Sequence, residues 1–274
     1  MKIDRKRQLE SFGKLLDIMD QLREKCPWDR KQTLESLRPQ TIEETYELSD
    51  AILKGELDNL SKELGDLLLH VVFYAKIGEE KNSFDIADVC ERLCNKLIYR
   101  HPHVFGSVEV ENAEQVKQNW EQLKTKEKDG NKSVLSGVPE GLPSVIKAFR
   151  MQEKARAVGF DWVEKKEVWE KVEEELVEFK QALLAQEGSA DARQAQKESQ
   201  GELGDLLFAI INASRLYGLD PDTALESTCA KFRRRFGYLE EQTIKKGKNL
   251  KDMTLAQMEE YWEEAKDLEK EGRL

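Results

Sequence analysis

The sequence predicts an all-α protein built from two similar halves, and three observations carry that prediction. Hydrophobic residues make up 39% and charged residues 36% of the 274-residue chain, with only 6 prolines and 16 glycines. This composition is typical of long amphipathic helices. Apolar residues recur at helical spacing through most of the chain. The hexapeptide Glu-Leu-Gly-Asp-Leu-Leu occurs at residues 63–68 and again at 202–207, which indicates an internal duplication.

The helical spacing of apolar residues predicts where each helix lies. It is clearest in one stripe with a period of about 3.6 residues, which we expect to face the core. That stripe comprises Leu64, Leu67, Leu68, Val71, Val72 and Ala75. The predicted helices span residues 4–24, 34–54, 57–79, 83–100 and 112–127, then 144–156, 166–187, 193–217, 221–246 and 254–270. We expect each half to be of the four-helix-bundle type.

Residues that break helices or favour turns divide the chain near its middle. They include Asp129-Gly130-Asn131 and the run from Val138 to Pro143. We therefore predict an N-terminal domain over residues 1–127, a linker over 128–143 and a C-terminal domain over 144–274.

Several features around the hexapeptide occur in the same order in both halves. Those of the first half are Trp28-Asp29, Glu43-Glu44 with Glu47, Lys96 with Arg100, and Trp120. Those of the second are Phe160-Asp161, Glu174-Glu175 with Glu178, Lys231 with Arg235, and Trp262. Two homologous helical domains are the simplest explanation of this shared order.

Paired acids in each half indicate a metal site. Glu44 and Glu47 lie three residues apart, as do Glu63 and Asp66, so each pair projects from nearly one helix face. Bringing the two helices together would gather four carboxylates, whose repulsion a divalent cation would neutralise. The matching set in the second half is Glu175, Glu178, Glu202 and Asp205. Such oxygen ligands favour Mg²⁺, or Mn²⁺, over zinc. The alternative is a solvated acidic face, the usual role of a single pair in so charged a chain.

The repeated basic pairs have two interpretations. Lys96 and Arg100 lie one helical turn apart, as do Lys231 and Arg235, so each pair can present cationic donors to phosphate oxygens. They can equally be solvated surface residues.

The repeated tryptophans and glycines also leave two interpretations open. Trp120 and Trp262 either stack on a base or complete the core. Gly65 and Gly204 stand between acids inside helices, where glycine costs about 1 kcal/mol relative to alanine. Either a closely approaching ligand or helix packing alone would account for them.

The charge balance limits the partners and the location. A formal net charge of −10 argues against binding a nucleic acid polymer or an anionic membrane surface. The N-terminus has no apolar signal-peptide core, and no stretch approaches the roughly 20 apolar residues of a membrane span. We therefore expect a cytoplasmic protein.

The cysteines and the paired histidines do not indicate a second metal site. Cys26, Cys90, Cys94 and Cys229 form no Cys-x-x-Cys pair, and we expect buried free thiols. His101 and His103 are expected to anchor a loop.

At these residues the chain resembles the MazG family of nucleoside triphosphate pyrophosphohydrolases. The family's signature, Glu-Glu-x-x-Glu followed by Glu-x-x-Asp, is present in both halves. The resemblance extends to the stretches 26–29, 96–105 and 158–162, so that it covers nearly the whole chain as a tandem two-domain form. It implies Mg²⁺-dependent hydrolysis of a nucleoside triphosphate to the monophosphate and pyrophosphate, with catalysis in the C-terminal domain.

The resemblance also implies a role for each site residue of the second half. Glu175, Glu178, Glu202 and Asp205 would ligate the metal, and Glu174 and Glu175 would be catalytic, with Glu174 helping to activate water. Lys231 and Arg235 would bind phosphate, and Trp262 would contact the base. A further lysine is expected shortly before Glu202, where this chain has Glu198 with Lys197 beside it. We also expect a homodimer, because bundles with such sites commonly pair protomers. The alternatives are a nucleotide- or metal-sensing protein without turnover and a plain helical scaffold.

Overall fold

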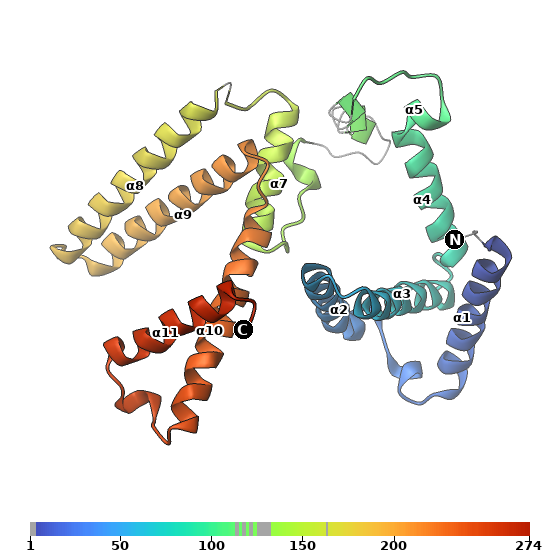
Figure 1. Ribbon diagram of the computed structural model, residues 1–274. Coiled ribbons are helices and arrows are strands. Elements are labelled where there is room, and N and C mark those ends of the chain that lie inside the picture. Colours follow the sequence, from blue (N-terminus) through green and yellow to red (C-terminus); the bar gives the residue numbers. More distant parts are fainter. Residues whose placement is uncertain (1–3, 113–114, 117–118, 121–122, 125–132, 163) are drawn as a thin grey trace. The chain divides into compact units, whose positions relative to one another are not determined.

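A computed structural model shows a helical protein, and the all-α prediction is confirmed (Figure 1). The structure describes residues 4–112, 115–116, 119–120, 123–124, 133–162 and 164–274. The described part of the chain contains helices, turns and coil but no strand. The chain folds into two compact units, Met1–Leu123 and Lys124–Leu274.

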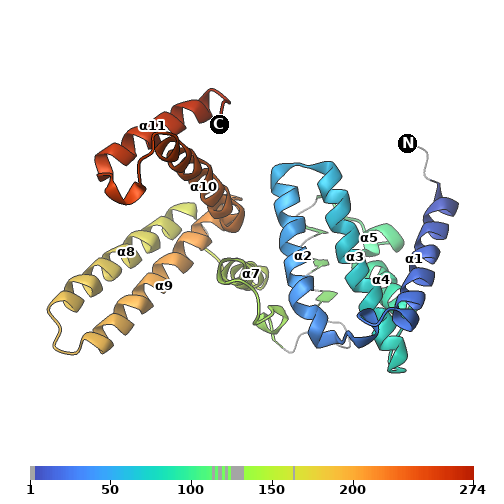
Figure 2. The ribbon, with the colours of Figure 1, turned by 90° about the horizontal axis from the view of Figure 1, so that it is seen from below.

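The first unit is built around a pair of long antiparallel helices. Its elements are α1 (Arg5–Lys25), a 3₁₀ turn η1 (Asp29–Lys31), α2 (Leu34–Lys54), α3 (Leu57–Glu80), α4 (Ile86–Arg100) and the short α5 (Pro102–Phe105). A reciprocal hydrogen-bonded cap between Thr33 and Ser36 begins α2. Gly55, at φ 69°, ends α2 in the left-handed conformation that glycine adopts most easily. The chain therefore reverses tightly, and α2 and α3 lie side by side (Figure 2).

The second unit contains a corresponding helix pair. Its elements are η2 (Leu135–Gly137), α7 (Ser144–Ala157), α8 (Lys165–Glu187), α9 (Ala192–Leu216), α10 (Pro221–Lys245), η3 (Leu250–Asp252) and α11 (Leu255–Lys270). The connection between α8 and α9 is longer than its counterpart in the first unit, and Asp191 caps α9 by accepting a hydrogen bond from the Gln194 amide at 3.1 Å. Both views show α8 and α9 side by side (Figures 1 and 2).

The two units follow the same order of long helices. The hexapeptide lies on α3 in one unit and on α9 in the other, and the preceding glutamates lie on α2 and α8. Helix α1 packs on α3 as α7 packs on α9. The sequence duplication is therefore a duplication of the helix pair.

Each helix pair has its own apolar core. In the first unit Met19, Leu37, Val72, Phe73 and Ile77 form the buried cluster. In the second unit the cluster consists of Val168, Val172, Leu206, Ala209 and Ala213.

The expectation that the whole leucine stripe of α3 faces this core is wrong. Val72 and Ala75 are buried, but Leu64, Leu68 and Val71 are 51%, 38% and 40% exposed. The helices that pack on α3 within the unit, α1, α2 and α4, leave this side of it uncovered. The matching residues of α9, which are Leu203, Leu207 and Ile210, are also exposed.

The expectation of buried cysteines is likewise wrong. Cys26 is half-buried, and Cys90, Cys94 and Cys229 are exposed. Cys90 and Cys94 lie on α4, of which no described residue is buried.

Two other expectations lie partly outside the described residues. These are the helix at 112–127 and the beginning of the linker at 128–143, whose remaining residues include η2. In the described ranges no helix is both long enough and apolar enough to cross a membrane.

Candidate metal centres

The first unit gathers three carboxylates between α2 and α3. Glu44 comes from α2, and Glu63 and Asp66 come from α3. One oxygen of each lies within 4.8 Å of the others, which is a spacing that a single cation can bridge. Glu63 is only 3% exposed, whereas Glu44 and Asp66 are half-buried. The antiparallel helices thus bring together acids that are about 20 residues apart in sequence.

The second unit gathers three carboxylates between α8 and α9. Glu175 and Glu178 project from α8 and Glu202 from α9, again with ligand oxygens within 4.8 Å of one another. Glu175 is 7% exposed, and Glu178 lies one turn further along α8 at the surface.

The two clusters use different members of the four predicted acids. The first includes Asp66 but not Glu47, and the second includes Glu178 but not Asp205, within the residues that the structure describes. Glu47 and Asp205 are both exposed on the same helices as the clusters. The metal roles of these two residues therefore stay predictions.

Repulsion and burial perturb one acid in each cluster. Burial, and then the charges of Asp66, Glu47 and Glu63, raise the pKa of Glu44 above its ordinary value of 4.5. Burial raises the pKa of Glu178 in the same direction, helped by the charges of Glu175, Glu174 and Glu202. Each cluster thus holds more negative charge than it accommodates easily.

A lysine that the sequence motifs did not indicate lies next to each cluster and relieves part of this charge. In the second unit the Lys171 ammonium lies 2.8 Å from Glu175 and 3.1 Å from Glu174. In the first unit Lys62 lies 3.1 Å from Glu63 and 4.0 Å from Asp66. Hydrogen bonds to these carboxylates raise the pKa of both lysines. Lys171 precedes Glu175, and Lys62 precedes Asp66, by one helical turn, a spacing at which the pairs were detectable from sequence.

The first cluster has unsatisfied oxygens that a cation would fit. Glu44 Oε2 and Glu63 Oε2 are both buried and have no hydrogen-bond partner among the residues that the structure describes. A buried carboxylate oxygen without a donor is unfavourable, and oxygen-only donor sets suit hard divalent ions. The residues present therefore fit Mg²⁺ or Mn²⁺.

The predicted phosphate and base residues of the second unit lie together on α10 and α11. Arg235 hydrogen-bonds to Glu269 Oε2 through Nε at 2.9 Å and Nη2 at 2.6 Å. Its guanidinium also stacks over the ring of Trp262, 5.9 Å from the ring centroid. Lys231 is exposed on the same helix. Arg235 and Trp262 are therefore in contact, as the phosphate and base roles require, but the guanidinium is already hydrogen-bonded to Glu269.

The first unit repeats the arginine–tryptophan contact. Arg100 lies over the Trp120 ring at 5.5 Å, and the His101 ring meets the same tryptophan edge-on at 4.7 Å. His101 Nδ1 lies 2.6 Å from the Leu97 carbonyl oxygen. Lys96 is exposed on α4. These contacts agree with a loop-anchoring role for His101.

The remaining predicted residues lie at the surface. Glu174 is exposed beside Lys171. Lys197 is exposed near the start of α9, where it lines a shallow hollow together with Arg193 and Gln200. Their catalytic and substrate roles stay predictions.

The helix surface at Gly65 and Gly204 is open within this chain. A Cβ atom built at either position meets no atom of the described residues within 4 Å. Helix packing inside the chain, one of the two interpretations, therefore does not explain these glycines.

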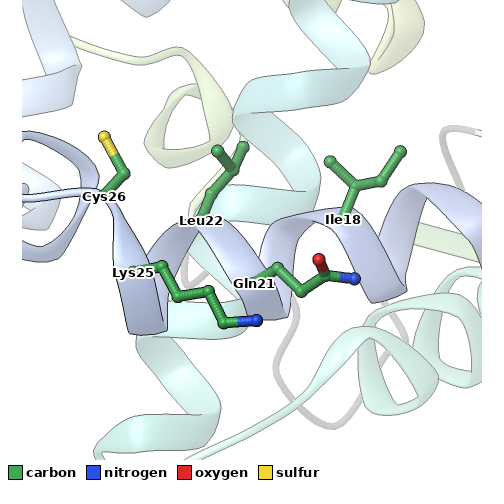
Figure 3. Close-up of a pocket in the computed structure, with 5 residues that line it drawn as sticks. All are labelled: Ile18, Gln21, Leu22, Lys25 and Cys26. Carbon is green, nitrogen blue, oxygen red and sulfur yellow. The ribbon is translucent and has the colours of Figure 1, made fainter.

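A hollow on α1 is not a candidate for this chemistry. It is lined by Ile18, Gln21, Leu22, Lys25 and Cys26, with the apolar side chains along one side of the helix (Figure 3). None of these residues is acidic, so the hollow has no carboxylate for a hard cation.

Both units place a carboxylate cluster between two antiparallel helices. This arrangement defines a class of helical proteins with acidic sites that suit hard divalent cations. Comparison with known proteins narrows this class. Residues 32–105, which contain the first cluster, match the MazG nucleotide pyrophosphohydrolase domain.

Relatives match over nearly the full chain. A protein of Thermotoga maritima named nucleoside triphosphate pyrophosphohydrolase/pyrophosphatase MazG is 45% identical, covering 93% of this chain and 95% of its own length. The nucleoside triphosphate pyrophosphohydrolase of Escherichia coli is 40% identical, covering 94% of this chain and 98% of its own. A crystal structure of a MazG-related protein from Thermotoga maritima aligns with 41% of this chain and 98% of that chain, at 26% identity and a TM-score of 0.37. The chain belongs to the MazG family.

Proposed function

We propose that this protein is a nucleoside triphosphate pyrophosphohydrolase that uses a divalent cation. The relatives named for this activity cover nearly the whole chain. The observation that carries the proposal is the convergence of three carboxylates within 4.8 Å between the helices of each pair. An acidic protein can accept a triphosphate, which bears about four negative charges, only if cations offset the repulsion.

The cation is Mg²⁺, with Mn²⁺ as a substitute. Glu175, Glu178 and Glu202 would hold it in the second unit, with Asp205 as a further ligand. When bound, a divalent ion polarises the phosphate and lowers the pKa of a coordinated water. The Lys171 ammonium, 2.8 Å from Glu175, would compete with the ion for this carboxylate.

The reaction transfers the nucleotidyl group of the substrate, the nucleoside with its α-phosphorus, to water. The water oxygen bonds to the α-phosphorus, the bond to the bridging oxygen breaks, and pyrophosphate leaves with that oxygen. Glu174, exposed beside the cluster, would orient the water and accept its proton. The products are a nucleoside monophosphate and pyrophosphate. Such chemistry needs mainly positioning and charge neutralisation.

Substrate contacts are assigned to α9, α10 and α11. Lys231 and Lys197 are exposed cations that can reach phosphate oxygens. Arg235 would exchange its hydrogen bonds to Glu269 for bonds to phosphate, and Trp262 would stack on the base. Support for this assignment comes from the arginine–tryptophan contact that recurs in the first unit as Arg100 and Trp120.

We assign turnover to the domain at 144–274 and a metal-binding role to the domain at 1–127. Glu44, Glu63 and Asp66, with Glu47, are the ligands proposed for the first domain, and Lys96 and Arg100 its phosphate-binding candidates. A linker at 128–143 and a cytoplasmic location complete the proposal.

A homodimer is part of the proposal. Leu64, Leu68 and Val71 are exposed on α3, and an uncovered apolar row of this kind favours a helical partner. A second copy of the same helix pair would complete a four-helix bundle. The open surface at Gly65 would let that copy, or the substrate, approach closely.

Product analysis tests the proposal. The protein is incubated with a panel of ribo- and deoxyribonucleoside triphosphates with Mg²⁺, with Mn²⁺, or with EDTA, and the products are resolved. We expect equal amounts of monophosphate and pyrophosphate with either ion and none with EDTA. Nucleotide binding without monophosphate formation would instead identify a sensing protein, and diphosphate release would contradict the assigned bond cleavage.

A further inference from the structure

A hydrogen-bonded network connects α2 to α3 next to the first carboxylate cluster. The Thr41 hydroxyl donates to the Leu37 carbonyl at 3.1 Å. Thr41 Oγ1 also lies 2.6 Å from the Tyr74 hydroxyl and 3.1 Å from His70 Nδ1. Because a hydroxyl has one proton, Tyr74 O–H and His70 Nδ1–H are the donors to Thr41. His70 is only 6% exposed, so the network is part of the interior.

The network is one helical turn from the metal ligands on both helices. Thr41 precedes Glu44 by three residues on α2, and His70 follows Asp66 by four residues on α3. At these spacings each polar residue shares a helix face with the adjacent acid. The hydrogen bonds that join Thr41 to His70 and Tyr74 therefore connect α2 and α3 one turn away from the carboxylates.

The second unit has apolar residues at the same three places. Val172 precedes Glu175 as Thr41 precedes Glu44, and Ala209 and Ala213 follow Asp205 as His70 and Tyr74 follow Asp66. All three belong to the buried apolar cluster of that unit. The two carboxylate clusters are thus alike, but the residues one turn from the acids are polar and hydrogen-bonded in the first unit and apolar in the second; the hydrogen bond from Trp169 to Tyr217 links α8 to the end of α9 further from the acids.

Directional bonds restrict how two helices can sit against each other. A satisfied buried polar network favours one register, whereas valine and alanine contacts are compatible with small shifts. Groups behind metal ligands tune affinity by fixing ligand orientation. In the first unit this matters because Glu44 comes from one helix, and Glu63 and Asp66 from the other.

We infer that His70 and Tyr74, acting through Thr41, are positioning residues that hold α2 and α3 in the register in which Glu44, Glu63 and Asp66 share one cation. The inference rests on the proposed metal role of this cluster. It makes the first unit's cluster a cation site whose ligand geometry is held by hydrogen bonds between its two helices.

Manganese binding to the full-length protein tests this inference. The second cluster is first disabled by Glu175→Gln with Glu202→Gln, and free Mn²⁺ is then measured by electron paramagnetic resonance. Into this background are placed Thr41→Val, His70→Ala and Tyr74→Ala together, which give the first unit the character of the second. We expect the dissociation constant for Mn²⁺ to rise roughly tenfold or more, as for other changes behind metal ligands.

Single conservative variants separate positioning from stability. Tyr74→Phe removes only the hydroxyl and should weaken Mn²⁺ binding. The single variants His70→Ala and His70→Asn are compared next. His70→Asn keeps an N–H close to the place of Nδ1, so it should bind Mn²⁺ with most of the affinity that His70→Ala loses. Tyr217→Phe, which loses a comparable hydroxyl contact with Trp169 in the second unit, should leave Mn²⁺ binding unchanged. Melting temperatures are recorded for all variants, and binding is measured well below them.

The outcomes are distinct. If the background protein binds no Mn²⁺, the proposed metal role of the first cluster fails. If it binds Mn²⁺ and the triple variant and Tyr74→Phe bind it equally well, the metal role stands and the positioning role of His70 and Tyr74 is overturned. Should the triple variant not fold, weaker binding by Tyr74→Phe with recovery by His70→Asn relative to His70→Ala still supports the inference.

Discussion

Two buried oxygens, Glu44 Oε2 and Glu63 Oε2, have no hydrogen-bond donor among the described residues of the chain. Each such unsatisfied group costs about 1–3 kcal/mol. A folded protein keeps that cost only where something offsets it, and a hard cation between the three carboxylates of the cluster does so. In the second unit the Lys171 ammonium lies 2.8 Å from Glu175, as Lys62 lies 3.1 Å from Glu63 in the first, so a lysine offsets part of the charge of each cluster.

Acid should weaken metal binding at both clusters. The folded-state pKa values of Glu44 and Glu178 are raised, so between pH 4.5 and the raised value the folded apoprotein holds protons that the unfolded chain releases. The stability that these protons contribute is present at low pH and is lost as pH rises through the folded pKa. A bound cation needs the ionised carboxylates and therefore has the opposite dependence.

The rise in melting temperature on adding Mg²⁺ measures this competition. We expect a larger rise at pH 7.5 than at pH 5, with the difference reduced in the Glu44→Gln, Glu178→Gln double variant. An equal rise at both pH values would contradict competition between protons and the ion at these carboxyls.

At the scale of the helices, periodicity and the duplicated motifs predicted α1–α4 and α7–α11 within a few residues. These patterns could not predict which side of α3 is covered. Leu64 and Val72 are both hydrophobic, but packing against neighbouring helices buries Val72 and leaves Leu64 exposed. The carboxylate clusters were predictable because three-residue spacings on paired helices determine a common face. The lysines beside them lie one helical turn from their partner acids on the same helix, so their pairing could also be predicted from spacing. The network at Thr41 could not, because it depends on side-chain geometry across two helices.

The open glycine surface on α9 leads to a prediction at this scale. Gly204→Ala should raise the free energy of unfolding by up to about 1 kcal/mol, since alanine favours the helix and its Cβ meets nothing in the chain. It should also lower kcat/KM several-fold, because the added methyl group stands between Glu202 and Asp205.

Gly13→Ala on α1 is the matched control, since its Cβ also has open space. It should bring a similar gain in stability with unchanged turnover. If Gly204→Ala were as active as the control, the glycine would have no role in admitting substrate or a second copy.

For the whole molecule, we predict a dimer held by the exposed apolar rows. Light scattering of the full chain should give twice the chain mass. Leu64→Glu with Leu68→Glu should yield a monomer with unchanged helical circular dichroism. In a symmetric dimer the glutamates of the two copies would face each other, and their like charges would repel. Leu9→Glu on α1, where the leucine is 65% exposed, should stay dimeric. A wild-type monomer would contradict the dimer proposal.

The assignment of turnover to one of two similar clusters is the central claim, and one measurement tests it most directly. Pyrophosphate release from a nucleoside triphosphate with Mg²⁺ is compared between Glu175→Gln, Glu202→Gln and the matched pair Glu44→Gln, Glu63→Gln, with both proteins shown to be folded. We predict that the Glu175→Gln, Glu202→Gln variant loses at least about a hundredfold in kcat, as expected when charge stabilisation of the transition state is removed. The Glu44→Gln, Glu63→Gln variant should retain most of its turnover. Retained turnover in the first pair and its loss in the second would contradict the assignment and place the active site between α2 and α3.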